Sequence, residues 1–484
     1  MATNLQNLEP NPLWKHFDKI LEIPRCSGNE TAIGDYIISV AENNNLEVKR
    51  DDSGNIVVKK DATEGHENAE IIILQGHIDM VCEKNSDVDH DFTKDPIQSE
   101  IKGEWVQANG TTLGADNGIG IAASLAVMED DSLSHGPLEF LYTIDEERGL
   151  IGANKIEPGF LSGKILLNLD SEEEGTFTIG CAGGADSEIK LPFSRKDSKT
   201  GEVYRLKISG LRGGHSGTDI NQGRGNAIKW LSRILWEASK KAQFEIVSIE
   251  GGNMRNAIPR EAWADMCIEP TKIDSLSSAI KESFENLQFE FKAIEKESAY
   301  SFEKHEDTNE APLANESQKT LINLLFTLPH GVISMHPEIE NLVETSTNLA
   351  IVHTHKDYAQ IVNSTRSSIA SALEGTRHSI EASCELTGAD IKQEEGYPGW
   401  VPNLESPILK KMKEIYKRDF QKEPEVGAIH AGLECGIIGE KFPGMDMISF
   451  GPTIEHPHSP EERVHIDSVK KFWNFLTTIL EEAS

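Results

Sequence analysis

The sequence has few cysteines and no segment that suggests export or membrane insertion. Its six cysteines, Cys26, Cys82, Cys181, Cys267, Cys384 and Cys435, are scattered and form no CxxC pair. Such usage argues against a disulfide framework and predicts free thiols in a reducing compartment. No apolar run reaches the roughly 18 residues that span a bilayer, and the first residues, "MATNLQNLEPNPLWKHF", lack the pattern of a signal peptide. We therefore expect a cytoplasmic protein.

Positive charge is also scarce. The 47 lysines and arginines are outnumbered by 80 aspartates and glutamates, which gives a formal net charge of −33. Nucleic acids and anionic membranes are bound through clustered lysine and arginine, so the sequence argues against both as partners. Solubility explains most of the acidic excess, and this excess does not repel metal cations.

The chain does have length and a regular alternation of strand and helix signals. Its 484 residues exceed what one hydrophobic core usually serves, so two domains, or one domain with an insertion, are expected. Strand-length apolar runs at 69–77, 137–145 and 164–171 are separated by helical patterns such as 117–130. This order predicts an α/β fold with a mostly parallel mixed sheet flanked by helices.

The pattern changes after about residue 187, where alternating strands and long amphipathic helices predict an α+β insertion over residues 187–392. The helix and strand pattern of the first part returns beyond "EEGYPGWVPN". We therefore expect residues 393–484 to complete one domain with residues 1–186.

Polar residues that could bind a metal follow several of the apolar runs. The carboxyl ends of parallel strands lie at one edge of a sheet, so residues just beyond them should meet. Asp116, in "TTLGADNGIG", stands just before the predicted helix 117–130. The predicted cluster contains His77, Asp116, Glu147, Asp170 and His458, with Asp79 and Glu146 beside them.

This cluster has the chemistry of a metal centre. Two imidazoles and three carboxylates form a nitrogen and oxygen ligand set that suits zinc, manganese or cobalt. Three neighbouring carboxylates would repel one another without a cation, and two divalent ions, bridged by Asp116, would remove that repulsion. Asp79 lies two residues from His77 and fits the carboxylate that orients a metal-bound imidazole. Each residue alone is more often an ordinary polar side chain, so the joint pattern carries the prediction.

Five motifs, "GHIDMV", "TTLGADNGIGIA", "IDEERGLIGA", "LNLDSEE" and "GPTIEHPHSPEE", resemble those of the M20 family of dinuclear zinc peptidases. The resemblance covers essentially the whole chain and is greatest to the branch that cleaves dipeptides, including X-His dipeptides. It implies a catalytic domain with an inserted lid domain. It also implies two divalent cations, with zinc expected and cobalt or manganese as alternatives, and attack on unblocked dipeptides by a hydroxide that bridges them.

Residue by residue, the resemblance implies the following metal ligands. His77 and Asp170 would bind one ion. Glu147 and His458 would bind the other, and Asp116 would bridge the two.

The resemblance also assigns residues beside the ions. Asp79 would orient His77, and Glu146 would act as the general base. His458 is preferred to His456, two residues away, because "HSPEE" resembles the late motif of the family.

Three residues of the predicted insertion are candidates for binding substrate. His215, in "GLRGGHSGTDI", resembles the lid histidine that reaches the substrate carbonyl, and the glycines before it allow close approach of the backbone. Asn256 is a second candidate. Arg366 would suit the free carboxylate of a dipeptide through a bidentate pair, and a surface ion pair is the equally weighted alternative.

Several other functions remain open at this point. A related tripeptidase, carboxypeptidase or amidohydrolase of N-acyl amino acids would share the same chemistry. A noncatalytic metal- or peptide-binding protein would not need Glu146 beside the ligands, and a dinuclear phosphatase would need a cluster of Arg and Lys. The protein is expected to be a monomer or a homodimer.

Overall fold

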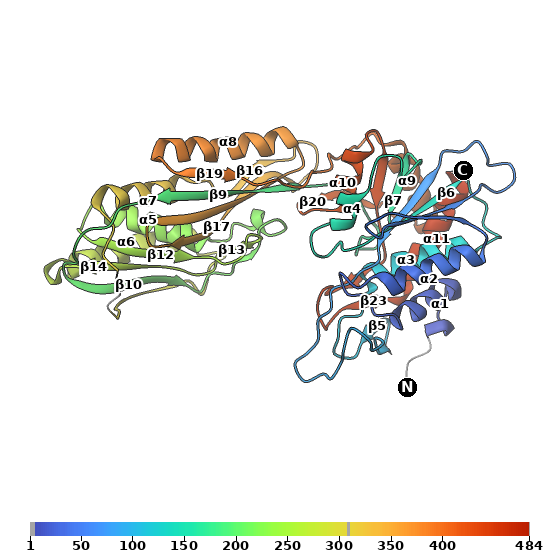
Figure 1. The fold of residues 1–484 in the computed structure, drawn as a ribbon, viewed down its shortest axis with the longest axis horizontal. Helices are drawn as coiled ribbons and strands as arrows, with labels where there is room; N and C mark the ends of the chain where they lie inside the picture. Colours follow the sequence, from blue (N-terminus) through green and yellow to red (C-terminus); the bar gives the residue numbers. More distant parts are fainter. Residues whose placement is uncertain (1–4, 307–309, 484) are drawn as a thin grey trace. The chain divides into compact units, whose positions relative to one another are not determined.

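In the computed structural model, which describes residues 5–306 and 310–483, the chain forms two compact units (Figure 1). The first unit comprises the residues up to Cys181, Trp400–Ala428 and the residues from Leu433 onward. The second comprises Ala182–Gly399 and the short segment Ile429–Gly432. The segment 187–392 lies inside the second unit.

The limits expected from sequence, at residues 186 and 393, fall in two strands of the second unit. Residue 186 lies within β9 (Gly183–Pro192), and residue 393 ends β19 (Asp390–Gln393). These two strands pair with each other, so the second unit is longer at both ends than the predicted insertion.

The first unit is built around an eight-stranded sheet with the order β1-β2-β6-β3-β7-β21-β8-β20. Its four middle strands, β6, β3, β7 and β21, pair in parallel, whereas β1, β2 and β8 pair antiparallel. Every residue of β3 and β6 is buried, as expected for strands covered on both faces. The strands are β1 (Glu47–Arg50), β2 (Ile56–Lys60), β3 (Ile72–His77), β6 (Leu138–Thr143), β7 (Ile165–Asn168), β8 (Thr176–Cys181), β20 (Glu425–Ile429) and β21 (Asp446–Ser449).

Helices α1, α2, α3, α9 and α11 of the first unit share one hydrophobic core with this sheet. α3 is buried except at its last residue, Glu129; it contacts β3 and is contacted by α1, α2 and α11 (Figure 1). The helices are α1 (Asn11–Leu21), α2 (Thr31–Asn43), α3 (Ala115–Glu129), α4 (Ile151–Lys155), α9 (Pro407–Phe420), α10 (Glu434–Lys441) and α11 (Ile466–Glu482), with a 3₁₀ turn at Leu5–Asn7. A small antiparallel sheet contains β4 (Ser99–Lys102), β5 (Trp105–Ala108), β22 (Ile454–Glu455) and β23 (Arg463–His465).

The second unit is an α+β layer with its own core. Its nine-stranded sheet has the order β15-β10-β14-β12-β17-β18-β9-β19, with β16 paired to β17. Besides β9 and β19, the strands are β10 (Glu202–Ser209), β12 (Glu245–Gly251), β14 (Ala262–Ile268), β15 (Ala299–Lys304), β16 (Gly331–Met335), β17 (Val343–Thr354) and β18 (Tyr358–Ser367). The helices are α5 (Ala227–Ala238), α6 (Ile273–Glu290), α7 (Asn315–Thr327) and α8 (Ala370–Thr387), with 3₁₀ turns at Ile220–Gln222 and Pro270–Lys272. A two-stranded ladder joins β11 (Gly214–His215) to β13 (Ala257–Ile258).

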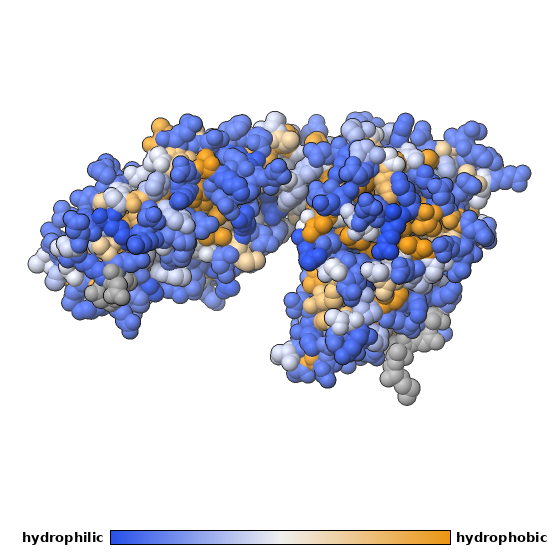
Figure 2. All heavy atoms as spheres, in the orientation of Figure 1, coloured by the Kyte–Doolittle hydropathy of each residue, from blue (hydrophilic) through white to orange (hydrophobic). Residues whose placement is uncertain are grey.

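Hydrophilic residues dominate the face shown in Figure 2 in both units. This agrees with the large acidic excess of the sequence. Within 5–306 and 310–483, none of the helices has the length and apolar character that a membrane crossing requires.

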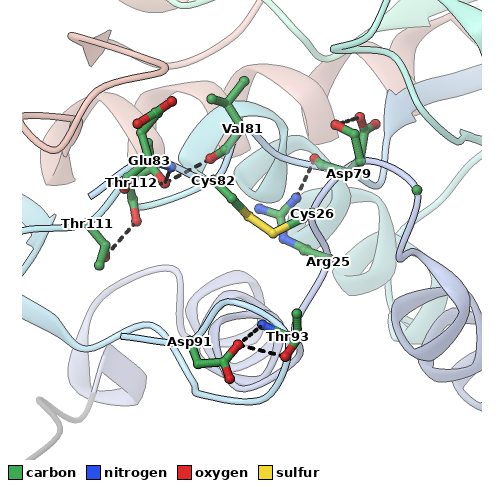
Figure 3. The surroundings of a disulfide bond; sticks show 12 residues. Arg25, Cys26, Asp79, Val81, Cys82, Glu83, Asp91, Thr93, Thr111 and Thr112 are labelled. Carbon is green, nitrogen blue, oxygen red and sulfur yellow. Dashed lines mark hydrogen bonds between the residues drawn. A yellow bond between two sulfur atoms is a disulfide. The ribbon is translucent and has the colours of Figure 1, made fainter. Parts of the chain in front are cut away.

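One expectation about the cysteines is wrong. Cys26 and Cys82 form a disulfide, with their Cα atoms 5.7 Å apart (Figure 3). The other four cysteines are free, as predicted, and the structure shows that all four are buried. The pair is separated by 56 residues, so no local spacing indicated it; only the fold brings residue 26 beside the segment that follows β3.

Candidate metal centre

The first unit brings the predicted cluster together. His77 is the last residue of β3 and is fully buried. Asp116 lies in the first turn of α3, where its backbone is still non-helical. The other members follow strand ends: Glu147 comes after β6, Asp170 after β7, and His458 lies between β22 and β23.

Asp116 stands between the two histidines. Its Oδ1 lies 3.0 Å from Nε2 of His77, and its Oδ2 lies 3.0 Å from Nε2 of His458. Nε2 of His77 is also 3.3 Å from Oδ1 of Asp170. Nε2 of His458 is 3.1 Å from Oε2 of Glu147. Each oxygen of Asp116 therefore faces a different histidine and carboxylate pair.

The ligand-type atoms form two groups that share Asp116. In His77, Asp116 and Asp170, and again in Asp116, Glu147 and His458, they all lie within 4.8 Å of one another. The group His77, Glu146 and Glu147 meets the same condition. Such distances suit a cation that takes one atom from each residue. Among the groups found in the described part of the chain, His458 contributes and His456 does not.

The electrostatics of this cluster fit a bound cation. Oε1 of Glu147 and Oδ1 of Asp170 are buried, and neither has a hydrogen-bond partner within the residues that the structure describes. Burial raises the pKa of Asp170 to about 6 against the opposing effect of His77. Burial acts in the same direction on Asp116, but hydrogen bonds from His458 and His77 hold its pKa below the usual range. Buried carboxylates with unused oxygens are satisfied by a divalent cation, so the residues present fit one.

Asp79 connects the motif "GHIDMV", in which it lies, to the motif "IDEERGLIGA", which carries Glu146 and Glu147. Its Oδ1 lies 3.3 Å from Nδ1 of His77 and accepts a hydrogen bond from the backbone N–H of Glu146 at 3.0 Å. Its Oδ2 accepts from the backbone N–H of Glu147 at 3.2 Å and from the hydroxyl of Ser27 at 2.7 Å. Asp79 therefore fixes the turn that carries both glutamates, a contact that sequence reasoning did not anticipate.

Glu146 differs in environment from its neighbour Glu147. Burial raises the pKa of its carboxyl well above the usual value, and the nearby Asp170 and Glu434 add to the rise. A carboxyl group with a raised pKa can accept a proton and return it near neutral pH.

Two buried glutamates near the centre were missed from sequence. Glu434, the first residue of α10, accepts hydrogen bonds from Nε2 of Gln75 at 2.6 Å and from the hydroxyl of Thr143 at 2.7 Å. Burial raises the pKa of Glu434 to about 7. The other, Glu462, accepts backbone N–H groups near Asp116. Glu434 begins a helix and Glu462 directly precedes β23, so the strand-end rule, by which ligands lie just beyond the ends of parallel strands, did not select either residue.

The predicted residues of the second unit also have defined environments. Nδ1 of His215 accepts the backbone N–H groups of Gly217 and Thr218, each at 3.2 Å. Because Nδ1 is an acceptor, the neutral ring carries its proton on Nε2, which can donate to a ligand. Burial, with the nearby Arg366, lowers the pKa of His215, so the neutral form prevails at neutral pH.

Arg366 and Asn256 differ in exposure. Arg366 is only 8% exposed, and its Nη1 donates to the hydroxyl of Tyr397 at 2.9 Å. Its Nε is buried and has no partner in the part of the chain that is described. This environment does not fit the surface ion pair considered from sequence. Asn256 is exposed, and its backbone carbonyl accepts the backbone N–H of Ser216.

A buried histidine of the second unit was also missed. His430 lies in the short segment Ile429–Gly432 and its Nε2 is 2.7 Å from the hydroxyl of Ser346. Burial, together with Arg366, lowers its pKa to about 4. His430, in "AIHAGLE", directly follows β20, as Glu147 and Asp170 follow their strands, so the strand-end rule could have selected it.

Comparison with known proteins defines the class. The family model described as Peptidase family M20/M25/M40 matches residues 73–482, and the chain therefore belongs to this family of peptidases. The resemblance recognised in the sequence motifs is confirmed.

Two similar relatives extend over the whole chain. The cytosol non-specific dipeptidase of Escherichia coli (strain K12) is 43% identical over 481 residues, which cover 99% of each chain. The crystal structure of aminoacylhistidine dipeptidase from Vibrio alginolyticus superposes with a TM-score of 0.93 at 43% identity, covering 99% of this chain and 98% of that one. The aminopeptidase PepT of Bacillus cereus shares the fold, with a TM-score of 0.58 at 16% identity over 98% of this chain and 99% of that one.

Proposed function

We propose that this protein is a metal-dependent dipeptidase that hydrolyses unblocked dipeptides, X-His dipeptides among them. The observation that carries the proposal is the pair of ligand groups that share Asp116, with Glu146 beside them. The full-length similarity to a non-specific dipeptidase and an aminoacylhistidine dipeptidase supports the choice of substrate.

The first unit would hold two divalent cations, for which zinc is our first choice. His77 and Asp170 would serve one ion, Glu147 and His458 the other, and Asp116 both. Nitrogen and oxygen ligands of this kind suit zinc, with cobalt or manganese as alternatives. Bound divalent ions lower the pKa of water and polarise a carbonyl, which is the chemistry that peptide hydrolysis requires.

The residues of the chain would handle the proton and the substrate. Glu146 would accept a proton from the attacking water and pass it to the leaving amine. Asp79 would keep Nδ1 of His77 protonated and Nε2 free to act as a ligand. His215 would donate from Nε2 to the substrate carbonyl oxygen as negative charge develops there.

Both ends of a dipeptide have candidate partners. The unused Nε of the buried Arg366 favours the free carboxylate. The free amine would be bound by carboxylates that lie near the metal centre but are not proposed ligands, such as Glu434 and Glu172. A related tripeptidase, carboxypeptidase or amidohydrolase is the alternative. Dependence on the free amine separates a dipeptidase from the last two, and a tripeptide substrate separates it from the first.

We also propose a cytoplasmic location. The support is the name of the Escherichia coli relative, which places that protein in the cytosol. The Cys26–Cys82 disulfide removes the argument from free thiols for those two residues.

A small panel of substrates tests the proposed function. Unblocked dipeptides, including X-His, are expected to be cleaved well, and their N-acetylated forms poorly, because acetylation removes the charged amine. A tripeptide and an N-acetyl amino acid complete the panel, and kcat/KM is measured for each with and without a chelator. Equal rates on free and acetylated dipeptides would favour a carboxypeptidase or amidohydrolase instead.

His215→Ala is expected to lower kcat by roughly 10²–10³-fold, the effect of losing one donor to a developing oxyanion. Metal content, measured by elemental analysis, should not change. His336→Ala is the matched control, because Nδ1 of His336 also accepts two backbone N–H groups, from Glu338 and Ile339. If both variants turn over at the normal rate, His215 has only the structural role that it shares with His336.

A further inference from the structure

The loop before α3 surrounds a buried carboxylate. Oε2 of Glu462 accepts the backbone N–H groups of Leu113 and Gly114 at 2.7 and 2.9 Å. Oε1 accepts those of Ala115 and Asp116 at 2.7 and 3.3 Å. Four successive N–H groups converge on this one side chain, which is 2% exposed. Successive backbone N–H groups in such a turn form a concave binding site for an anion, and Glu462 fills it.

Gly114 makes this turn possible. Its backbone is left-handed, with a φ of 72°, which glycine adopts without strain. A Cβ atom at this position would lie 2.6 Å from Nη2 of Arg25 and 2.8 Å from Sδ of Met80. The loop therefore passes directly against the guanidinium of Arg25.

Arg25 holds the same region through its carbonyl groups. Its Nη1 donates to the carbonyl of Asp79 at 2.7 Å (Figure 3) and to that of Ile78 at 3.2 Å, and its Nη2 donates to the carbonyl of Gly114. Arg25 is 2% exposed. One buried cation thus joins the loop of Asp116 to the segment that carries His77 and Asp79.

We propose that Glu462 and Arg25 are positioning residues that set the metal affinity of the centre by fixing the backbone of Asp116 and of the segment 77–79. This rests on the proposed metal centre. Asp116 is the residue that both ligand groups share, so a shift of its backbone changes both groups at once. Residues that do not bind the metal but hold its ligands in place typically contribute about 10–100-fold to metal affinity.

Glu462→Gln removes the anion with little change in shape. One oxygen becomes an NH₂ group, which cannot accept a hydrogen bond and faces two backbone donors. The loop must then move or leave those N–H groups unpaired, which is costly in a buried site. The zinc affinity is expected to fall by about 10–100-fold, as measured by competition with a chromophoric chelator.

Glu139→Gln is the matched control. Glu139 lies at the opposite end of β6 from Glu146, is 1% exposed, and accepts the backbone N–H groups of Ser162 and Gly163. Both variants should lower the melting temperature of the metal-free protein, because both lose buried hydrogen bonds. Only Glu462→Gln should also lower the zinc affinity.

The possible outcomes separate this inference from the proposed function. A wild-type protein that binds no zinc would refute the metal centre itself. A wild-type protein that binds zinc, with Glu462→Gln and Glu139→Gln binding equally well, would overturn the positioning role. If Glu462→Gln does not fold, Arg25→Lys is measured in the same way. Lysine keeps the positive charge but lacks the two separate nitrogens that donate to the carbonyls of Asp79 and Gly114. Unchanged zinc affinity in folded Arg25→Lys would then overturn the inference.

Discussion

Glu146→Gln is expected to leave the protein folded and loaded with metal but to slow turnover by at least about 10²–10⁴-fold, the range of general acid–base catalysis. Glutamine keeps the shape of the side chain and removes its ability to take a proton. The backbone N–H of Glu146 still donates to Asp79, so the turn should hold. Metal stoichiometry and kcat are the two quantities to measure.

Glu147→Gln serves as the contrast from the adjacent position. Oε2 of Glu147 lies 3.1 Å from Nε2 of His458, within a proposed ligand group. This variant should bind metal more weakly, and added metal should restore part of its activity. If instead Glu146→Gln loses metal while Glu147→Gln retains it and turns over slowly, the two roles are reversed.

Removal of divalent cations is expected to abolish hydrolysis. The candidate site gathers three carboxylates and two imidazoles, and without cations no residue of this set can polarise the substrate carbonyl as strongly. Elemental analysis after mild purification should find up to two divalent ions per chain. Dialysis against a chelator should remove both the ions and the activity, and addition of zinc should restore them.

Full activity in protein shown to be metal-free would contradict the proposed chemistry. A melting temperature measured alongside is the necessary control, because an ion that binds the folded state also stabilises it. Loss of activity in protein that remains folded at the assay temperature is therefore the result that supports the proposal.

The strand-end rule explains why so much of the candidate site was visible in the sequence. His77 ends a buried strand, Glu147 and Asp170 follow two others, and these strands, β3, β6 and β7, are parallel neighbours whose carboxyl ends meet. The apolar runs indicated where the strands lie, and the parallel pairing of these strands places the polar residues at one edge of the sheet. The match of the M20/M25/M40 model then confirmed the family.

The residues that support the site were not predictable in the same way. Glu462 and Arg25 act through backbone groups of residues far away in the chain, and a glutamate or an arginine near a loop carries no signal of such a contact. The Cys26–Cys82 disulfide was missed for the same reason, since only the tertiary fold brings the two residues together. A change in the pattern of strand and helix signals locates the limits of an insertion only approximately. The expected limits therefore fell within β9 and at the end of β19.

The spread of the candidate ligands along the chain has a consequence for biosynthesis. Asp116 and His458 meet across 342 residues, so a ribosome makes all of the group His77, Asp116 and Asp170 long before His458, the last residue of the other group, exists. Domains generally begin to fold as they emerge during synthesis, and the first sheet also waits for β21, at Asp446–Ser449. A nascent chain could therefore not complete the centre until residue 458 had been added. The enzyme would remain inactive on peptides throughout its own translation, and an aborted chain would be released without peptidase activity.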